Sequence, residues 1–200
     1  MKITRTLKTN LSIGLRTAIR TLGQELSTQR SHRRAVRKAA ALTYPIKLNL
    51  GSGLRPRHVD GWVNVDVNSD ADLQLDLREP LPFPDESVSE IYTEHFLEHL
   101  SYPNLDDSTA WDVETPDRPS HVLSLLRECR RVLVSNGVLD IVVPDASLIV
   151  TEYVLSQTEH ASSIPSWWGP RWCNTPMHRV NYVFRQGREH LYAYDEETLT

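Results

Sequence analysis

Residues 46–66 read IKLNLGSGLRPRHVDGWVNVD, and this stretch decides the fold. Two apolar segments, 46–50 and 62–66, are separated by Gly, Pro and Asp residues that favour turns, so the stretch predicts two short strands. Gly51-Ser52-Gly53 follows the first segment directly, and Asp66 ends the second. Each predicted strand therefore carries a turn or an acidic side chain at its carboxyl end.

The alternation of strands and helices continues toward the C-terminus. Residues 71–77 and 88–93 predict a third and a fourth strand, and a fully buried fifth strand is expected at 138–143. A helix is expected to begin near Asp117 or Ser120 and to end at Asn136-Gly137, because these two residue types favour helix C-termini. Continuous apolar strands that alternate with helices predict an α/β fold, a Rossmann-like parallel sheet with helices on both faces.

Charge is distributed unevenly along the chain. Residues 1–40 hold ten Lys and Arg against one acid, Glu25, whereas the remainder holds twelve Lys and Arg against twenty-five acids. Apolar residues recur at helical spacing in the first part, so residues 1–42 are predicted to form a basic helical arm and residues 43–200 the main domain. The arm is expected to pack on the domain or a partner protein, to lie on a membrane surface, or to act as a transit peptide. The acidic domain argues against nucleic acid as a partner.

The cysteine content and the hydropathy of the sequence indicate the cellular compartment. The two cysteines, Cys129 and Cys173, are too few for a disulfide framework. No stretch approaches the roughly eighteen consecutive apolar residues of a membrane-spanning helix. These features favour a cytoplasmic protein, with attachment to a membrane periphery through the arm as a variant.

The predicted strand ends carry groups suited to an adenosyl ligand. In open α/β sheets, ligands bind beyond the carboxyl ends of the strands, where glycine lets the backbone approach closely. A dinucleotide fingerprint would need a third glycine where Pro56 stands, and the linker 51–61 is too short for a helix that could hold a pyrophosphate. A cofactor without phosphate fits better. Asp66 could accept both ribose hydroxyls, and Asp76, at the end of the third strand, the adenine amine.

These stretches, taken together, resemble class I S-adenosylmethionine-dependent methyltransferases of the type 11 kind. The resemblance covers about residues 46–155 and resumes near 190–199, and its order and spacing both fit. Besides the stretches above, it rests on Pro80-Leu81-Pro82-Phe83, Glu94-His95-Phe96-Leu97-Glu98-His99 and Arg127-Glu128-Cys129-Arg130-Arg131-Val132-Leu133.

The resemblance implies S-adenosyl-L-methionine as cofactor and a small molecule or glycan as methyl acceptor. The residues that it places at the cofactor are Asn49, Gly51, Ser52 and Gly53 at the methionine part, Asp66 at the ribose, and Asp76 with Leu77 at the adenine. If the acceptor is a hydroxyl, His95 is the first candidate for the base, with Glu94, Glu98 and Asp145 in reserve. The family closes with an antiparallel strand pair, which is expected to be missing here because a helix starting near Asp195 meets the chain end.

Two rival functions are consistent with parts of the sequence. One is a non-catalytic module that binds an adenosyl ligand or a partner. The other is a zinc hydrolase, since residues 95–99 spell H-x-x-E-H, which on a helix would place two histidines on one face. The position of this motif directly after a parallel strand favours the methyltransferase, so no metal is expected. In that interpretation a neighbouring carboxylate or carbonyl satisfies His99.

Overall fold

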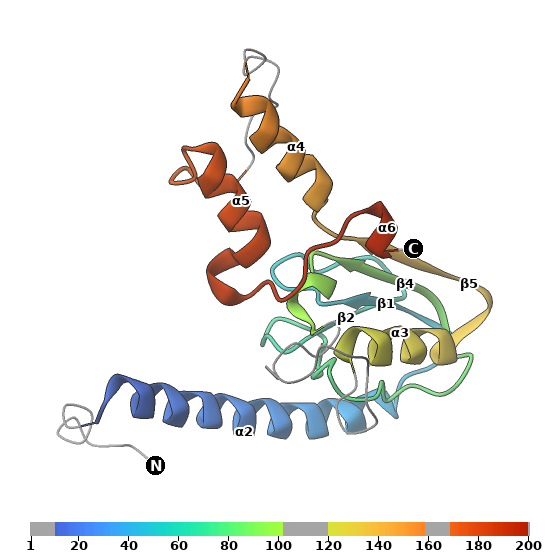
Figure 1. Cartoon of the computed structure of the whole chain (residues 1–200). Coiled ribbons are helices and arrows are strands. Elements are labelled where there is room, and N and C mark those ends of the chain that lie inside the picture. Colours follow the sequence, from blue (N-terminus) through green and yellow to red (C-terminus); the bar gives the residue numbers. More distant parts are fainter. Residues whose placement is uncertain (1–10, 102–119, 159–168, 200) are drawn as a thin grey trace.

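The computed structural model describes residues 11–101, 120–158 and 169–199, and its centre is one five-stranded sheet (Figure 1). Neighbouring strands all pair in parallel, in the order β3-β2-β1-β4-β5. This topology confirms the predicted Rossmann-like α/β fold. The strands are β1 (Ile46–Leu50), β2 (Trp62–Asp66), β3 (Leu73–Gln74), β4 (Val88–Glu94) and β5 (Leu133–Val142).

Two helices cover one face of the sheet. Alternate side chains of β1, from Ile46 to Leu50, are buried in a single apolar core with residues of α2 and α3. In Figure 1 these helices run below the sheet, whereas α4 and α5 pack together beyond its carboxyl end. The helices are α2 (Ile13–Ala39), α3 (His121–Val132), α4 (Ala146–Ser156), α5 (Pro176–Arg185) and α6 (Glu196–Leu199), with short 3-10 turns η1 (Leu97–His99) and η3 (Gln186–Arg188).

The other face of the sheet is covered differently. The Arg57 guanidinium, from the loop 51–61, lies 3.6 Å from the centre of the Tyr92 ring and 4.6 Å from that of Trp62. Such stacking covers the two aromatic rings with a planar cation. Among the described elements, α5 approaches this side only near the carboxyl edge, across a cavity. The described helices α2 and α3 thus cover one face, whereas the loop 51–61 covers the other and α5 reaches it only at the cavity, so the predicted helices on both faces are found in part.

The predicted helix after residue 117 and the predicted fifth strand differ in their bounds from α3 and β5. Helix α3 begins after the capping hydroxyl of Ser120, as predicted, but ends at Val132 rather than at Asn136-Gly137. Asn136 instead adopts a positive φ of 64° inside β5, where the register with β4 shifts. The prediction that the fifth strand is fully buried is wrong: Val138 is 55% exposed. β5 lies at the sheet edge, and no described helix packs over that side chain.

The described part of the predicted arm forms one long helix, α2, whose C-terminal end packs on the domain; residues 1–10 of the arm lie outside the described residues. Ser12 caps the N-terminus of α2. The first half of this helix exposes apolar side chains such as Ile13 and Leu22. Ala35 and Ala39, in contrast, belong to the domain core, so packing shows no break at the predicted boundary after residue 42. The contact of the exposed half with a membrane or a protein stays a prediction. Among the described helices, none combines the length and apolar character needed to cross a bilayer.

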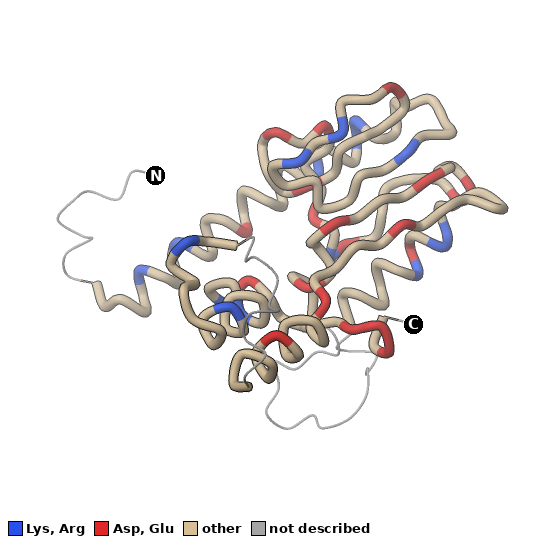
Figure 2. The backbone as a smooth tube through the Cα atoms, turned by 90° about the horizontal axis from the view of Figure 1, so that it is seen from above, with Lys and Arg blue, Asp and Glu red and all other residues tan. Residues whose placement is uncertain are grey.

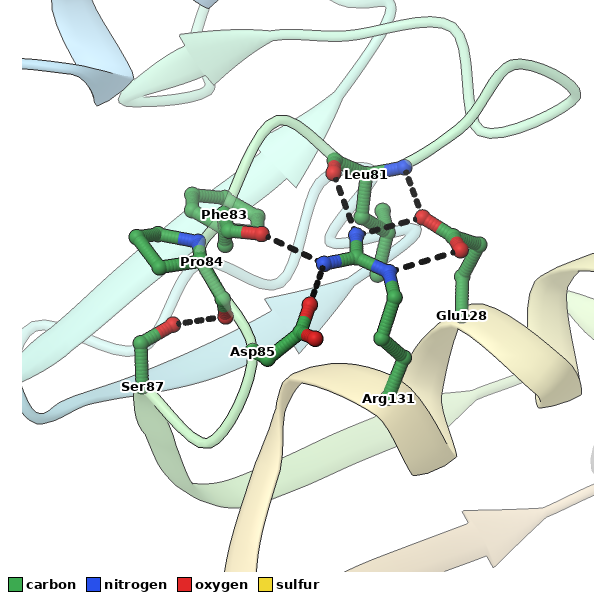
Figure 3. A network of polar contacts seen from close by, with 7 residues as sticks. All are labelled: Leu81, Phe83, Pro84, Asp85, Ser87, Glu128 and Arg131. Atoms are coloured by element: carbon green, nitrogen blue, oxygen red, sulfur yellow. Dashed lines mark hydrogen bonds and ion pairs between the residues drawn. The ribbon is translucent and has the colours of Figure 1, made fainter.

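Arg131 joins α3 to the loop that precedes β4 (Figure 3). Its guanidinium donates hydrogen bonds to both carboxylate oxygens of Glu128, at 2.9 and 2.6 Å. It also donates to Asp85 and to two backbone carbonyls, those of Leu81 and Phe83. The hydrogen bonds and charge of Arg131 hold the pKa of Glu128 below its usual range. This network lies at the amino end of β4, away from the carboxyl edge of the sheet.

We expect Arg131→Gln to lower the free energy of unfolding by about 1–2 kcal/mol, because several charge-assisted hydrogen bonds are lost at a partly exposed site. Chemical denaturation at pH 7 measures this change. The depressed pKa of Glu128 stabilises the fold above the pKa of the unfolded state, and this contribution is lost as pH falls through the folded value. The difference between wild type and variant should therefore shrink in acid. Arg130→Gln, at an exposed neighbouring position, is the control. Equal effects of the two substitutions would contradict the role of the network.

Candidate functional site

A cavity lies at the carboxyl edge of the sheet, where the strand order reverses between β1 and β4. Ligands of open α/β sheets bind at this position. The cavity has a volume of about 500 Å³, and its walls come from the loop after β1, the end of β4, η1 and α5. Four sequence-predicted cofactor residues, Asn49, Gly51, Ser52 and Gly53, line it together with the base candidates His95 and Glu94.

Packing within the chain explains one glycine of the turn after β1, and open space for a ligand is found at the other. Gly51 has a φ of 64°, and a Cβ built on it would lie 2.2 Å from the ring of Phe96. The absence of a side chain at Gly51 therefore makes room for the Phe96 ring. The sequence predicts room for a ligand there instead. Gly53 also has a positive φ, and a Cβ there would meet only one backbone oxygen, at 3.9 Å. Gly53 leaves open space where the sequence predicts a ligand.

Ser52 and Asn49 play different parts in the same turn. The Ser52 hydroxyl is buried and has no hydrogen-bond partner among the described residues. Such a group is costly unless a ligand or solvent pairs with it. The Asn49 amide, in contrast, donates to the side-chain oxygen of Asn64 and to the carbonyl of Arg55. Asn49 therefore braces the loop 51–61 and is mostly satisfied within the protein.

Asp66 stands at the end of β2, as predicted. One of its oxygens accepts a hydrogen bond from the backbone N–H of Gly53 and the other from that of Asn68. A carboxylate has about four acceptor positions, so both oxygens retain capacity for further donors. Asp66 lines a second cavity of about 260 Å³, next to Leu77 and Asp76.

Asp76 is connected to the arm helix α2 through Arg78. Its carboxylate binds the guanidinium of Arg78, which also contacts Glu25 of α2 at 2.9 Å. Burial raises the pKa of Asp76, but the hydrogen bonds and charge of Arg78 together outweigh it and hold the pKa below the usual value. An adenine amine at Asp76 would share the carboxylate with Arg78.

Phe96 lies between the two groups of predicted cofactor residues. Its ring packs on Gly51 and also lines the second cavity, with Asp66 and Leu77. The predicted methionine-side residues thus line one cavity and the predicted ribose- and adenine-side residues another. No feature of the sequence distinguishes Phe96 from an ordinary core aromatic residue, so its position was not predicted.

The base candidates occupy unequal positions. His95 follows β4 with a φ of 53°, and its Nδ1 lies 3.4 Å from a carboxylate oxygen of Glu98. That carboxylate favours the imidazolium, so the pKa of His95 lies above its ordinary value. Glu94 accepts hydrogen bonds from Arg55 and from the Tyr92 hydroxyl. Asp145 does not line the cavity; it is exposed and caps α4 by accepting from the N–H groups at 147 and 148.

Sequence reasoning missed the residues that α5 and the segment after it contribute. Tyr182, Gln186 and His190 line the cavity, although they follow Glu98 by more than eighty positions. His190 is placed there because the N–H of Leu191 donates to the Glu98 carbonyl at 2.7 Å. Burial lowers the pKa of His190. The resemblance near residues 190–199 was the one signal that this segment returns to the site.

Strand order and parallel pairing define a Rossmann-like α/β protein with a cavity at the switch point. No protein-family model matches the sequence, and comparison with curated proteins gives no match. Among solved structures, a chain of the "Complex between the Haloferax volcanii Trm112 methyltransferase activator and the putative methyltransferase" is similar, with 18% sequence identity and a TM-score of 0.34. The match covers 81% of this chain and 72% of that chain. At this TM-score, the likeness by itself carries no functional argument.

We expect Gly51→Ala to destabilise the fold by about 2–4 kcal/mol, because it adds a positive-φ penalty and a clash with Phe96. Gly61→Ala is a matched control, since Gly61 has a φ of 85° but nothing within 4 Å of a built Cβ. That control should cost about 1 kcal/mol. Denaturant titration of both variants measures the difference, and equal losses would show that Phe96 does not pack against the turn.

Proposed function

We propose that this protein transfers a methyl group from S-adenosyl-L-methionine to a small-molecule or glycan acceptor. The observation that carries the proposal is the joint position of the glycine turn, Asp66 and His95 at one sheet edge. The turn and His95 line a cavity at the strand-order switch between β1 and β4, and Asp66 lines the neighbouring one.

The residues present fit an adenosyl cofactor. The unpaired, buried Ser52 hydroxyl and the open space at Gly53 suit the polar methionine part. Asp66 retains acceptor capacity for ribose hydroxyls. The loop 51–61 contains no helix whose N-terminus could hold a pyrophosphate, which counts against a dinucleotide. When bound, the cofactor supplies an electrophilic methyl carbon.

The residues at the edge divide into binding and reacting groups. Gly51, Ser52 and Gly53 hold the methionine part, Asp66 the ribose, and Asp76 with Leu77 the adenine. His95 contacts the acceptor and takes its proton, and the Arg55–Glu94 ion pair forms the adjoining wall. Tyr182 and Val183 of α5 close the other side of the cavity and limit the access of water.

The size of the cavity and the charge of the domain support the proposal of a small acceptor. A cavity of about 500 Å³ has the size of small-ligand sites, so a small molecule or one end of a glycan suits it. Along the backbone of the sheet domain, positions of Lys and Arg are interspersed with positions of Asp and Glu (Figure 2). Nucleic acids bind to continuous positive surfaces, so we favour the small acceptor.

Asp66→Ala should weaken binding of S-adenosylhomocysteine at least about tenfold, because charge-assisted hydrogen bonds to the ribose are lost. Titration calorimetry on the full chain measures this affinity, with Asp66→Asn as a variant that preserves side-chain size. Asp70→Ala removes an exposed acid of the same loop and should leave affinity unchanged. Equal affinity of wild type and Asp66→Ala would refute the ribose assignment, and tighter binding of NAD would refute the cofactor.

His95→Gln should lower methyl transfer by about 10²–10⁴-fold while leaving the affinity for S-adenosylhomocysteine intact. The measurement uses methyl-labelled cofactor and panels of hydroxylated small molecules and oligosaccharides. A loss under about tenfold would make His95 a residue that only positions the acceptor. Cofactor binding without transfer to any panel member would instead support the non-catalytic module.

A further inference from the structure

Glu98 is a buried carboxylate that the methyl-transfer proposal does not use. Its side chain is 1% exposed, and neither carboxylate oxygen has a hydrogen-bond partner among the described residues. The nearest ionisable nitrogens are His95 Nδ1 at 3.4 Å and His190 Nε2 at 4.0 Å. Burying a carboxylate without donors costs several kcal/mol. Because Glu98 lines the cavity at the switch point between β1 and β4, a cation in that cavity could offset the cost.

Two histidines from different parts of the chain lie beside this carboxylate. Glu98, His99 and His190 each offer one ligand atom, and these three atoms lie within 4.8 Å of one another. The two imidazole rings meet edge to face, with centroids 4.8 Å apart. Backbone hydrogen bonds from Leu191 and Tyr192 to the Glu98 carbonyl hold the distant segment in this place.

Both histidines are oriented in the way that metal ligands usually are. His99 Nδ1 lies 3.1 Å from the carbonyl oxygen of Glu189, and His190 Nδ1 lies 2.5 Å from that of Val183. Since a carbonyl can only accept, each Nδ1 is the donor, which leaves Nε2 of each ring as the position for a metal. A backbone carbonyl behind the ring is the common device that fixes the tautomer of metal-bound histidine.

We propose that Glu98, His99 and His190 bind one divalent transition-metal ion, of the zinc type, at the wall of the cavity at the switch point between β1 and β4. Two imidazoles and one carboxylate are a ligand set of open zinc sites, which keep a further position for water or substrate. Ligand atoms on one zinc ion lie about 3.4 Å apart, so the widest separation here must close by roughly 1.4 Å on binding. This proposal replaces the expectation of a metal-free protein.

The proposed site differs from the H-x-x-E-H interpretation of the sequence. Residues 95–99 do not form an α-helix: His95 has a positive φ, and only Leu97–His99 form a 3-10 turn. The two histidines of that motif therefore do not share a helix face, and His95 is outside the proposed ligand set. The third ligand, His190, lies far from the motif in sequence.

The test uses the full chain, stripped with a chelator and titrated calorimetrically with zinc chloride or magnesium chloride. We expect one zinc ion per chain with a micromolar or lower dissociation constant, a melting temperature raised by several degrees, and no comparable magnesium binding. His190→Ala and Glu98→Gln should each weaken zinc binding about 100-fold or more. Glu98→Gln keeps the size of the side chain and removes a buried charge whose oxygens accept no hydrogen bond from the described residues, so its metal-free melting temperature should not fall.

Two control variants complete the design. His178→Ala removes an exposed histidine of α5 and should keep zinc affinity within about threefold of wild type. His95→Ala removes a histidine beside Glu98 but outside the ligand set, so this variant should still bind one zinc ion per chain. Absence of saturable zinc binding, or unchanged affinity in His190→Ala and Glu98→Gln, would overturn the proposal. Loss of binding in His95→Ala with retention in His190→Ala would overturn it in favour of the sequence motif. None of these readouts involves methyl transfer, so the two proposals can fail separately.

Discussion

The central position of β1 between two parallel partners is the constraint on which the rest of the structure depends. Its pairing with β2 and β4 brings Gly51, Asp66 and Glu94 to one edge of the sheet. Because the chain leaves β1 toward β2 on one side and returns to β4 on the other, this edge opens where the strand order reverses. Both proposed ligands depend on that opening.

Local sequence patterns predicted the first half of the sheet well. The segments 46–50 and 62–66 match β1 and β2 because their apolar residues lie next to strong turn residues, so the prediction needs no distant contact. The third strand was predicted too long, since only Leu73 and Gln74 pair with β2. The predicted end of α3 was wrong because Asn136 lies in β5, where the register with β4 shifts. An Asn-Gly pair favours a β-bulge as well as a helix C-terminus, so the sequence does not distinguish the two.

The site was predicted in part for a similar reason. Residues that follow a strand, such as Gly53, Asp66 and His95, lie where the order of the strands puts them. The contact of the Phe96 ring with Gly51 spans 45 residues of the chain, and that of Glu98 with His190 spans 92, so both depend on tertiary packing. Local sequence patterns carry no signal for pairs that are so far apart in the chain. Asp145 shows the converse, because a strand-end acid can equally well cap the next helix.

A crystal structure of the protein grown with S-adenosylhomocysteine tests the central claim most directly. The account predicts the homocysteine part against Gly51-Ser52-Gly53 and the ribose hydroxyls within hydrogen-bond distance of Asp66. The ring of Phe96 should then lie beside the ligand, since it lines the second cavity with Asp66. A ligand bound away from the carboxyl edge of β1, or bound there without contact to Asp66, would contradict the account.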